Sequence, residues 1–230
     1  MASASSQTRA ANRSLVWELA IVTVACLAVI HVLYLLRGNA FIGSHISYFV
    51  AYILIGAPIL VLWIRHRQLD FFTFGLKDFL RSLWIFFLTS VIIFPPFFLL
   101  AHLWQRYVWG AGGFHLVGYP DLVSAAIVQI LVIALPEEFY FRGYFQSAMD
   151  TIFKKRWGIF GARMGWGWLV TAIIFAFAHT FITYKWWHFS IFFPALVFGW
   201  LRERTGLVIA PTLFHASSNL LMSWFMSCYY

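Results

Sequence analysis

Seven long apolar runs, each close to the length that a helix needs to cross a lipid bilayer, dominate this chain. A helix covers the hydrocarbon core with about 20 apolar residues. The sequence predicts spans at approximately Leu15–Leu36, Ile46–Ile64, Leu83–Trp104, Leu122–Gln146, Trp168–Tyr184, Trp187–Leu201 and Leu207–Met226. The sixth run is short enough to be tilted or partly re-entrant. We therefore expect an all-α fold, a polytopic membrane helical bundle of about seven transmembrane helices.

The composition excludes a soluble globular domain of this size. Of the 230 residues, 62% are hydrophobic and only 10% are charged, whereas soluble domains keep about 25% of their residues charged. The net charge of +8 comes from short basic clusters between apolar runs. These clusters report membrane topology, so we expect no nucleic-acid partner. Cys26 and Cys228 define neither a disulfide framework nor a zinc motif.

The basic residues alternate between the two sides of the predicted bundle. Three of the sixteen Lys and Arg residues fall on one side, namely Arg37, Arg106 and Lys185, which leaves thirteen for the other side. Cytoplasmic loops of membrane proteins carry the excess of Lys and Arg. We therefore expect a cytoplasmic N-terminus, with residues 1–13 as a polar tail, and a C-terminus on the outside. The apolar run after this tail is longer than the core of a cleavable signal peptide, so we expect it to be retained.

The chain shows no internal repeat, low-complexity tract or long linker, which indicates a single domain over residues 1–230. Its motif-bearing core is expected at residues 122–226. The stretch Asp70–Arg81 alternates apolar and polar residues. This pattern predicts an interfacial helix on the cytoplasmic side, before the third span.

Ionisable side chains inside a bilayer are costly unless they are paired or line a hydrated cavity, so each is a candidate functional residue. Glu18 and His31, in the first span, have structural readings: Glu18 lies within a turn of the cytoplasmic end and can reach water, and His31 can bond a neighbouring carbonyl. The deeper candidates are Glu137, Glu138, Arg142, His179 and His215, together with the uncharged Asn219.

Two adjacent acids in the fourth span have different neighbours. Glu138 and Arg142 are four residues apart with the acid first, the better order for a helical ion pair, so Glu138 is expected to be structural. Glu137 lies about 100° round the helix and has no local cation. An unpaired carboxylate is free to take a proton, as a general base must. The alternative is that both acids share Arg142 as a structural clamp.

The last span places His215 and Asn219 four residues apart, on one helical face. Their side chains offer two hydrogen-bond donors to one point, as an oxyanion hole requires. With about 1.5 Å of rise per residue, Glu137, His179 and His215 all lie roughly 12 to 16 Å from the presumed cytoplasmic ends of their helices. The three side chains are therefore expected to meet near the middle of the membrane.

The same polar groups allow two other classes of function. A proton-coupled transporter or channel would use Glu137, His179 and His215 as a relay. The absence of a visible inverted repeat makes a transporter the weaker reading. A catalytically silent partner of other membrane proteins would have no need of these costly polar groups.

Three motifs, in order on three spans, carry a family resemblance: Glu137-Glu138-x-x-x-Arg142, then Phe175-x-x-x-His179, then His215-x-x-x-Asn219. The pattern resembles the CPBP family, the CAAX protease and bacteriocin-processing intramembrane endopeptidases. This family includes enzymes that cut prenylated CAAX proteins and bacterial members tied to bacteriocin handling and protein sorting. The resemblance covers about Leu131–Leu221, and the N-terminal spans match only in being apolar.

The resemblance implies a role for each motif residue. Glu137 and His179 would activate a water molecule, while His215 and Asn219 would stabilise the oxyanion formed at the scissile carbonyl. Glu138 and Arg142 would hold the site in shape. The implied activity is hydrolysis of a peptide bond near the C-terminus of a membrane-associated protein substrate.

The resemblance also bears on cofactor, substrate and location. Family members were long classed as metalloproteases, but the glutamate-type mechanism needs no metal and the chain has no H-E-x-x-H helix, so no cofactor is expected. If zinc is present, its ligands would be Glu137, His179 and His215. The compact, aromatic-rich chain resembles bacterial sorting-type members, called myxosortases, which implies a bacterial inner (plasma) membrane. A prenylated CAAX protein is the other candidate substrate.

Overall fold

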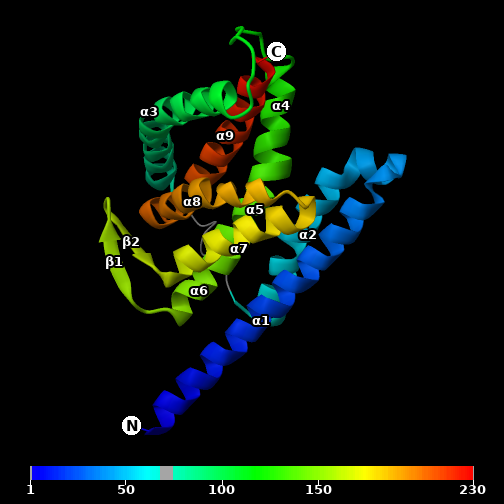
Figure 1. Ribbon diagram of the computed structural model, residues 1–230. Helices are drawn as coiled ribbons and strands as arrows, with labels where there is room; N and C mark the ends of the chain where they lie inside the picture. The colour runs from blue at the N-terminus through cyan, green and yellow to red at the C-terminus, as the bar shows by residue number, and fades with distance from the viewer. Residues whose placement is uncertain (1, 68–74, 230) are drawn as a thin grey trace.

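The chain forms a bundle in which one long interrupted helix packs against most of the others (Figure 1). The computed structural model describes residues 2–67 and 75–229. Within them, six helical units surround the central one: α1 (Ala2–Leu35), α2 (Ala40–Ile64), α3 (Leu76–Tyr107), α7 (Trp166–Thr183), α8 (Phe192–Thr205) and α9 (Ile209–Ser227). The central helix runs through α4 (Leu122–Val128), η3 (Gln129–Ala134), α5 (Leu135–Glu138), η4 (Phe139–Gln146) and α6 (Ser147–Ile152). Short 3-10 helices, Leu36–Gly38 and Trp186–Ile191, precede α2 and α8.

All seven predicted spans are helical, and five of these helices are long and apolar enough to cross a membrane. The last two differ for separate reasons. Helix α8 has only 14 residues, about 21 Å of rise, because the first residues of the predicted run form the 3-10 helix before it. Helix α9 has 19 residues, but the polar residues on it lower its mean hydropathy. The all-α polytopic prediction is confirmed, with two short strands added.

Helix α3 is sharply bent in its middle, so that its two halves run in different directions (Figure 1). Its interior contains Pro95 and Pro96. Two successive prolines remove two backbone donors and clash with the preceding turn, which accounts for the bend. The predicted interfacial helix over Asp70–Arg81 is not separate: residues 70–74 lie outside the described residues, and Leu76–Arg81 forms the first turns of α3.

The partners of Glu18 and His31, in the first span, differ from those that the sequence predicts. Glu18 is largely buried, at 9% exposure, and its carboxylate accepts hydrogen bonds from Arg65 at 3.0 Å and from Arg67 at 2.6 Å. The two arginines just after α2 neutralise the acid. His31 contacts the hydroxyl of Tyr184 at 2.9 Å through Nε2, rather than a carbonyl. These contacts fasten α1 to α2 at one level and to α7 at another.

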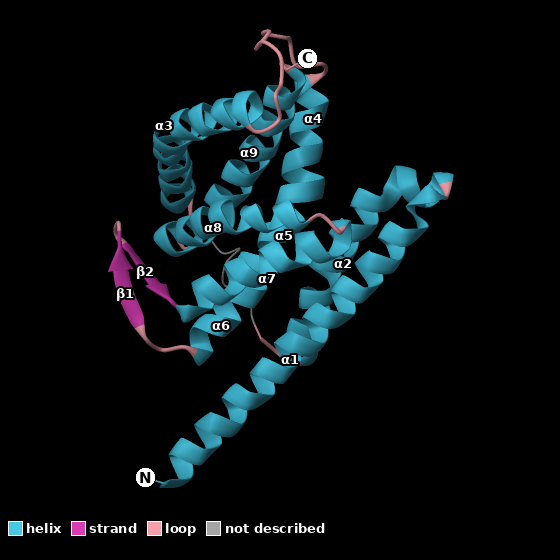
Figure 2. Cartoon of the chain, viewed as in Figure 1, coloured by secondary structure: helices cyan, strands magenta, loops and turns pink. Residues whose placement is uncertain are grey.

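A β-hairpin interrupts the helical succession between α6 and α7 (Figure 2). Strands β1 (Arg156–Ile159) and β2 (Ala162–Gly165) pair in antiparallel register. The two-residue turn uses Phe160 and Gly161, both with positive φ, as tight hairpin turns require. The indole of Trp200 on α8 donates to the carbonyl of Ile159 at 3.0 Å, which fastens the hairpin to the bundle.

Close packing around η4 positions the polar site. Gly199 lies where a Cβ would come within 2.4 Å of Cδ1 of Trp168 and 2.8 Å of Oε1 of Gln146, so only glycine permits this approach of α7, α8 and η4. The amide of Gln146 in turn donates to the Gly199 carbonyl at 3.2 Å.

The predicted polar tail is helical from Ala2, and α1 extends well beyond the bundle (Figure 1).

Candidate active site

The acids of the first motif lie on a short α-helical turn between two π-helical segments. Helix α5 is only four residues long, with η3 before it and η4 after it. A π-helix has wider turns than an α-helix, and such segments occur frequently at functional sites. The chain stays helical across the whole region, but its turns change width on both sides of Glu137 and Glu138. Sequence periodicity alone gave no sign of these changes.

Glu138 and Arg142 form the buried ion pair that their spacing predicts. Oε2 of Glu138 lies 3.2 Å from Nε of Arg142, and both side chains are fully buried. The guanidinium also donates to the carbonyl of Ala195 at 3.1 Å and lies over the Phe175 ring, 4.4 Å from its centroid. A buried charge pair needs such additional partners to offset the loss of water. The pair therefore joins the central helix to α8 and α7.

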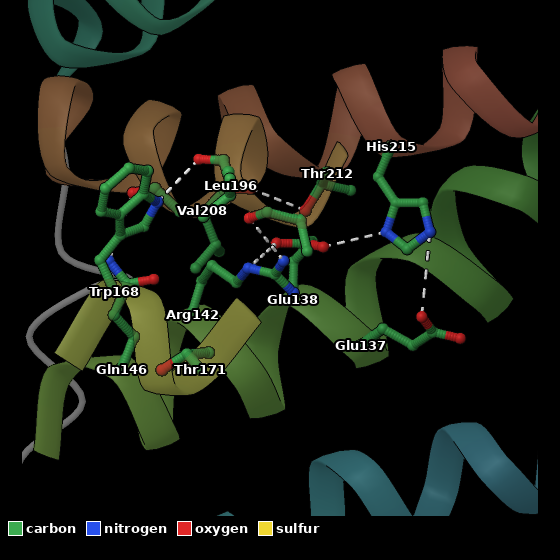
Figure 3. Close-up of polar contacts among 12 residues, drawn as sticks. Glu137, Glu138, Arg142, Gln146, Trp168, Thr171, Leu196, Val208, Thr212 and His215 are labelled. Atoms are coloured by element: carbon green, nitrogen blue, oxygen red, sulfur yellow. Dashed lines mark hydrogen bonds and ion pairs between the residues drawn. The ribbon is translucent and has the colours of Figure 1, made fainter. Parts of the chain in front are cut away.

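Glu138 has a second contact that the sequence did not indicate. Its Oε1 lies 2.9 Å from Nδ1 of His215, a contact drawn as a dashed line in Figure 3. The imidazole also stacks on Phe198, with ring centroids 4.6 Å apart and planes 16° from parallel. A carboxylate can only accept, so Nδ1 of His215 carries the proton in this contact. The contact and the stacking fix the ring and direct its Nε2 towards Glu137.

Glu137 faces both imidazoles. Its Oε2 lies 3.6 Å from Nε2 of His179 and 3.8 Å from Nε2 of His215. Nδ1 of His179 donates to the Phe175 carbonyl at 2.9 Å, so the neutral ring has its free lone pair on Nε2. Both separations exceed a direct hydrogen bond, and Oε2 of Glu137 is buried without a partner among the described residues. One water molecule beside this oxygen could contact the carboxylate and an imidazole at once.

Asn219 lies one turn beyond His215 on α9, but its side chain bonds to a residue that the sequence analysis missed. Its Nδ2 donates to Oε1 of Gln129 at 3.1 Å. The structure thus brings Glu137, His179 and His215 together. Asn219 lies on the same helix as His215, α9, and bonds to the first residue of η3. Gln129 has no partner at helical spacing in the sequence, but an amide in an apolar span is itself a signal of a hydrogen bond between helices.

Glu137, His179 and His215 carry the kinds of donor atom that bind zinc. Zinc in proteins takes nitrogen, sulfur and oxygen ligands at about 2.0 to 2.3 Å in tetrahedral geometry. In the ranges 2–67 and 75–229, no group of three or more His, Cys, Asp or Glu side chains is arranged to hold an ion. The contact of His215 with Glu138 is the kind that orients a ligand, but Glu137 and the two imidazoles do not form a preformed metal site here.

Comparison with known proteins gives one match. The model of the family described as type II CAAX prenyl endopeptidase, Rce1-like, matches residues 119–221. No curated protein and no solved structure matches the chain. The matched segment contains the central helix, α7, α8 and the part of α9 with the last motif. Residues 119–221 of this helical membrane protein therefore resemble CAAX-type intramembrane proteases, in agreement with the resemblance that its three motifs carry.

Proposed function

We propose that the chain is an endopeptidase that hydrolyses a peptide bond near the C-terminus of a membrane-associated protein, with Glu137 as the general base. The observation that supports this most directly is the position of the Glu137 carboxylate, which faces Nε2 of both His179 and His215 within a segment that matches a family of CAAX proteases. Glu137 has no cation on its own helix face, and a position between two imidazoles gives such an acid a role in proton transfer.

In the first step, Glu137 removes a proton from a water molecule that His179 orients. The free lone pair on Nε2 of His179 accepts one hydrogen of the water, and Oε2 of Glu137 takes the other as the water oxygen attacks the scissile carbonyl. The protonated Glu137 then donates to the amide nitrogen as the carbon–nitrogen bond breaks. The water proton ends on the leaving amine, and the carboxylate of Glu137 is regenerated.

His215 and Asn219 act on the oxyanion of the tetrahedral intermediate. His215 can donate from Nε2 when the ring carries two protons, and its Nδ1 donates to Glu138 at 2.9 Å, which holds the ring in place. Arg142 pairs with Glu138 and holds its carboxylate in place. Asn219 contributes an amide N–H from the next turn of α9. Donors held in position before the reaction stabilise developing charge without reorganisation, and for this reason they contribute strongly to rate.

Two substrate classes fit this chemistry: a prenylated CAAX protein, or a protein with a C-terminal sorting tail of the kind that myxosortase-like members process. Mass spectrometry of C-terminal fragments from cells with wild type and with Glu137→Ala would identify both reaction and target. Fragments present only with wild type are expected. Identical fragments in both cells would refute the proposal, and Glu137-dependent proton or solute flux in liposomes without cleavage would select a transporter.

We expect hydrolysis without a bound metal. Activity of the purified protein should change less than twofold after prolonged treatment with a strong zinc chelator, because Glu137 activates water as a base and this step needs no ion. Elemental analysis of the same sample should give well under one zinc per chain. Loss of activity that added zinc restores would contradict the proposal and assign Glu137, His179 and His215 as ligands.

The membrane orientation is part of the same proposal: N-terminus in the cytoplasm, C-terminus outside, in a plasma membrane that we take to be bacterial. It is supported by the thirteen-to-three distribution of basic residues and by the position of the two termini at opposite ends of the molecule (Figure 1). Labelling of single cysteines near either end with a membrane-impermeant thiol reagent measures the orientation. Reaction at the N-terminal end in intact cells would reverse it.

A further inference from the structure

Gln129 lies beside the proposed oxyanion hole and has no assigned role. It begins η3 on the central helix, and its Oε1 accepts a hydrogen bond from Nδ2 of Asn219 on α9 at 3.1 Å. Both side chains are partly buried, and the bond joins residues 90 positions apart in the chain. It is thus a specific tertiary contact between two helices that the site already uses.

The chemistry of this contact bears on how Asn219 presents its amide. An asparagine side chain has two free torsions and two unlike ends, a carbonyl that would repel an oxyanion and an NH2 group that would stabilise it. A neighbouring acceptor favours the rotamer whose nitrogen faces it. Because the NH2 group has two hydrogens, donation of one to Gln129 leaves the second in a fixed direction. The bond to Oε1 of Gln129 therefore holds the Asn219 amide in the orientation seen in the structure and leaves a donor free.

We propose that Gln129 is a positioning residue for catalysis, which holds the Asn219 amide so that its free N–H is directed at the oxyanion. This inference rests on the proposed function, because it gives Asn219 the oxyanion role stated there. Removal of the acceptor leaves the donor in place but lets it rotate. The expected loss in kcat is therefore smaller than the loss from removing the donor, which is about 100- to 1000-fold for one oxyanion-hole group.

The experiment is a double-mutant cycle in purified protein, with kcat and KM measured for each variant. Gln129→Met keeps an unbranched side chain of similar length without the acceptor, and should lower kcat about tenfold with KM changed less than twofold. In an Asn219→Ala background the same substitution should change kcat less than twofold. Gln105→Met is the matched control, since Gln105 is a buried glutamine that contacts α9 at Met226 instead. It should leave kcat unchanged.

The possible outcomes separate this inference from the proposed function. Equal losses of kcat from Gln129→Met in both backgrounds, or a change in KM alone, would overturn the positioning role while the role of Asn219 stood. A normal kcat for Asn219→Ala would overturn both. If Gln129→Met does not accumulate as folded protein, Gln129→Leu removes the same acceptor. Gln129→Glu keeps an acceptor at the same length and should retain a higher kcat than either variant.

Discussion

Replacement of Glu137 with glutamine is expected to lower kcat by at least about three orders of magnitude and to leave the fold intact. The substitution keeps the size of the side chain but removes the ability to take a proton from water, and the loss of a residue that acts as both base and acid has effects of this order. Glu137 makes no ion pair with Arg or Lys among the described residues, so its neutralisation leaves no charge unpaired. The measurement is single-turnover cleavage of a fluorescent peptide in detergent or nanodiscs.

Glu203→Gln is the matched control for this variant. Glu203 accepts a hydrogen bond from Gln146 at 2.9 Å near the end of α8, and a glutamine can still accept there. The control should retain kcat within about twofold, because the residue touches none of the motif side chains. Residual activity of Glu137→Gln above about a tenth of wild type would exclude Glu137 as the base and would favour direct activation of water by His179.

Replacement of Arg142 with methionine is expected to have the largest effect on stability, a loss of about 3 to 5 kcal/mol in the free energy of unfolding. The substitution leaves Glu138 as a charge in a fully buried position, with His215 as its one remaining polar partner in the part of the chain that the structure describes. It also removes the guanidinium from the Phe175 ring and from the Ala195 carbonyl. Unfolding in mixed micelles, monitored by tryptophan fluorescence, measures the difference.

Two further variants test the cause of that loss. Arg163→Met makes the same substitution at an exposed position of β2 and should change the free energy of unfolding by less than about 0.5 kcal/mol. Glu138→Gln combined with Arg142→Met removes both charges, and should recover part of the stability but not the activity, because His215 loses its carboxylate partner. A double variant no more stable than Arg142→Met would assign the loss to packing rather than to the unpaired charge.

The helical architecture could be predicted from the sequence because a bilayer admits few solutions: each run of about 20 apolar residues must satisfy its own backbone, and a helix does so. The meeting of Glu137, His179 and His215 could also be predicted, since each lies at a similar distance from the end of its span. The ion pair of Glu138 with Arg142 followed from their spacing. In each case a local rule and the membrane environment pointed to the same result.

Other features depended on contacts between distant segments, which no local rule supplies. Glu18 was expected to reach water because it lies near a span end, but Arg65 and Arg67 come from beyond α2 to cover it. The Phe160-Gly161 turn of the hairpin is weaker as a signal than the Asn-Gly or Asp-Gly pairs typical of such turns. The role of Gln129 depends on its hydrogen bond to Asn219, which lies on another helix 90 residues further along the chain.

The two π-helical segments that flank α5 place an unusual constraint on changes in chain length. A wide turn accommodates more residues than an α turn over a similar rise, and therefore sets the rotational phase between Glu137 and everything beyond η4. Deletion of one residue there would let the backbone return to ordinary α geometry with no break in the helix. A deletion between Glu137 and Arg142 would move the base about 1.5 Å along the helix axis relative to the ion pair. Single-residue insertions and deletions in this helix should consequently be far more harmful to activity than to membrane insertion.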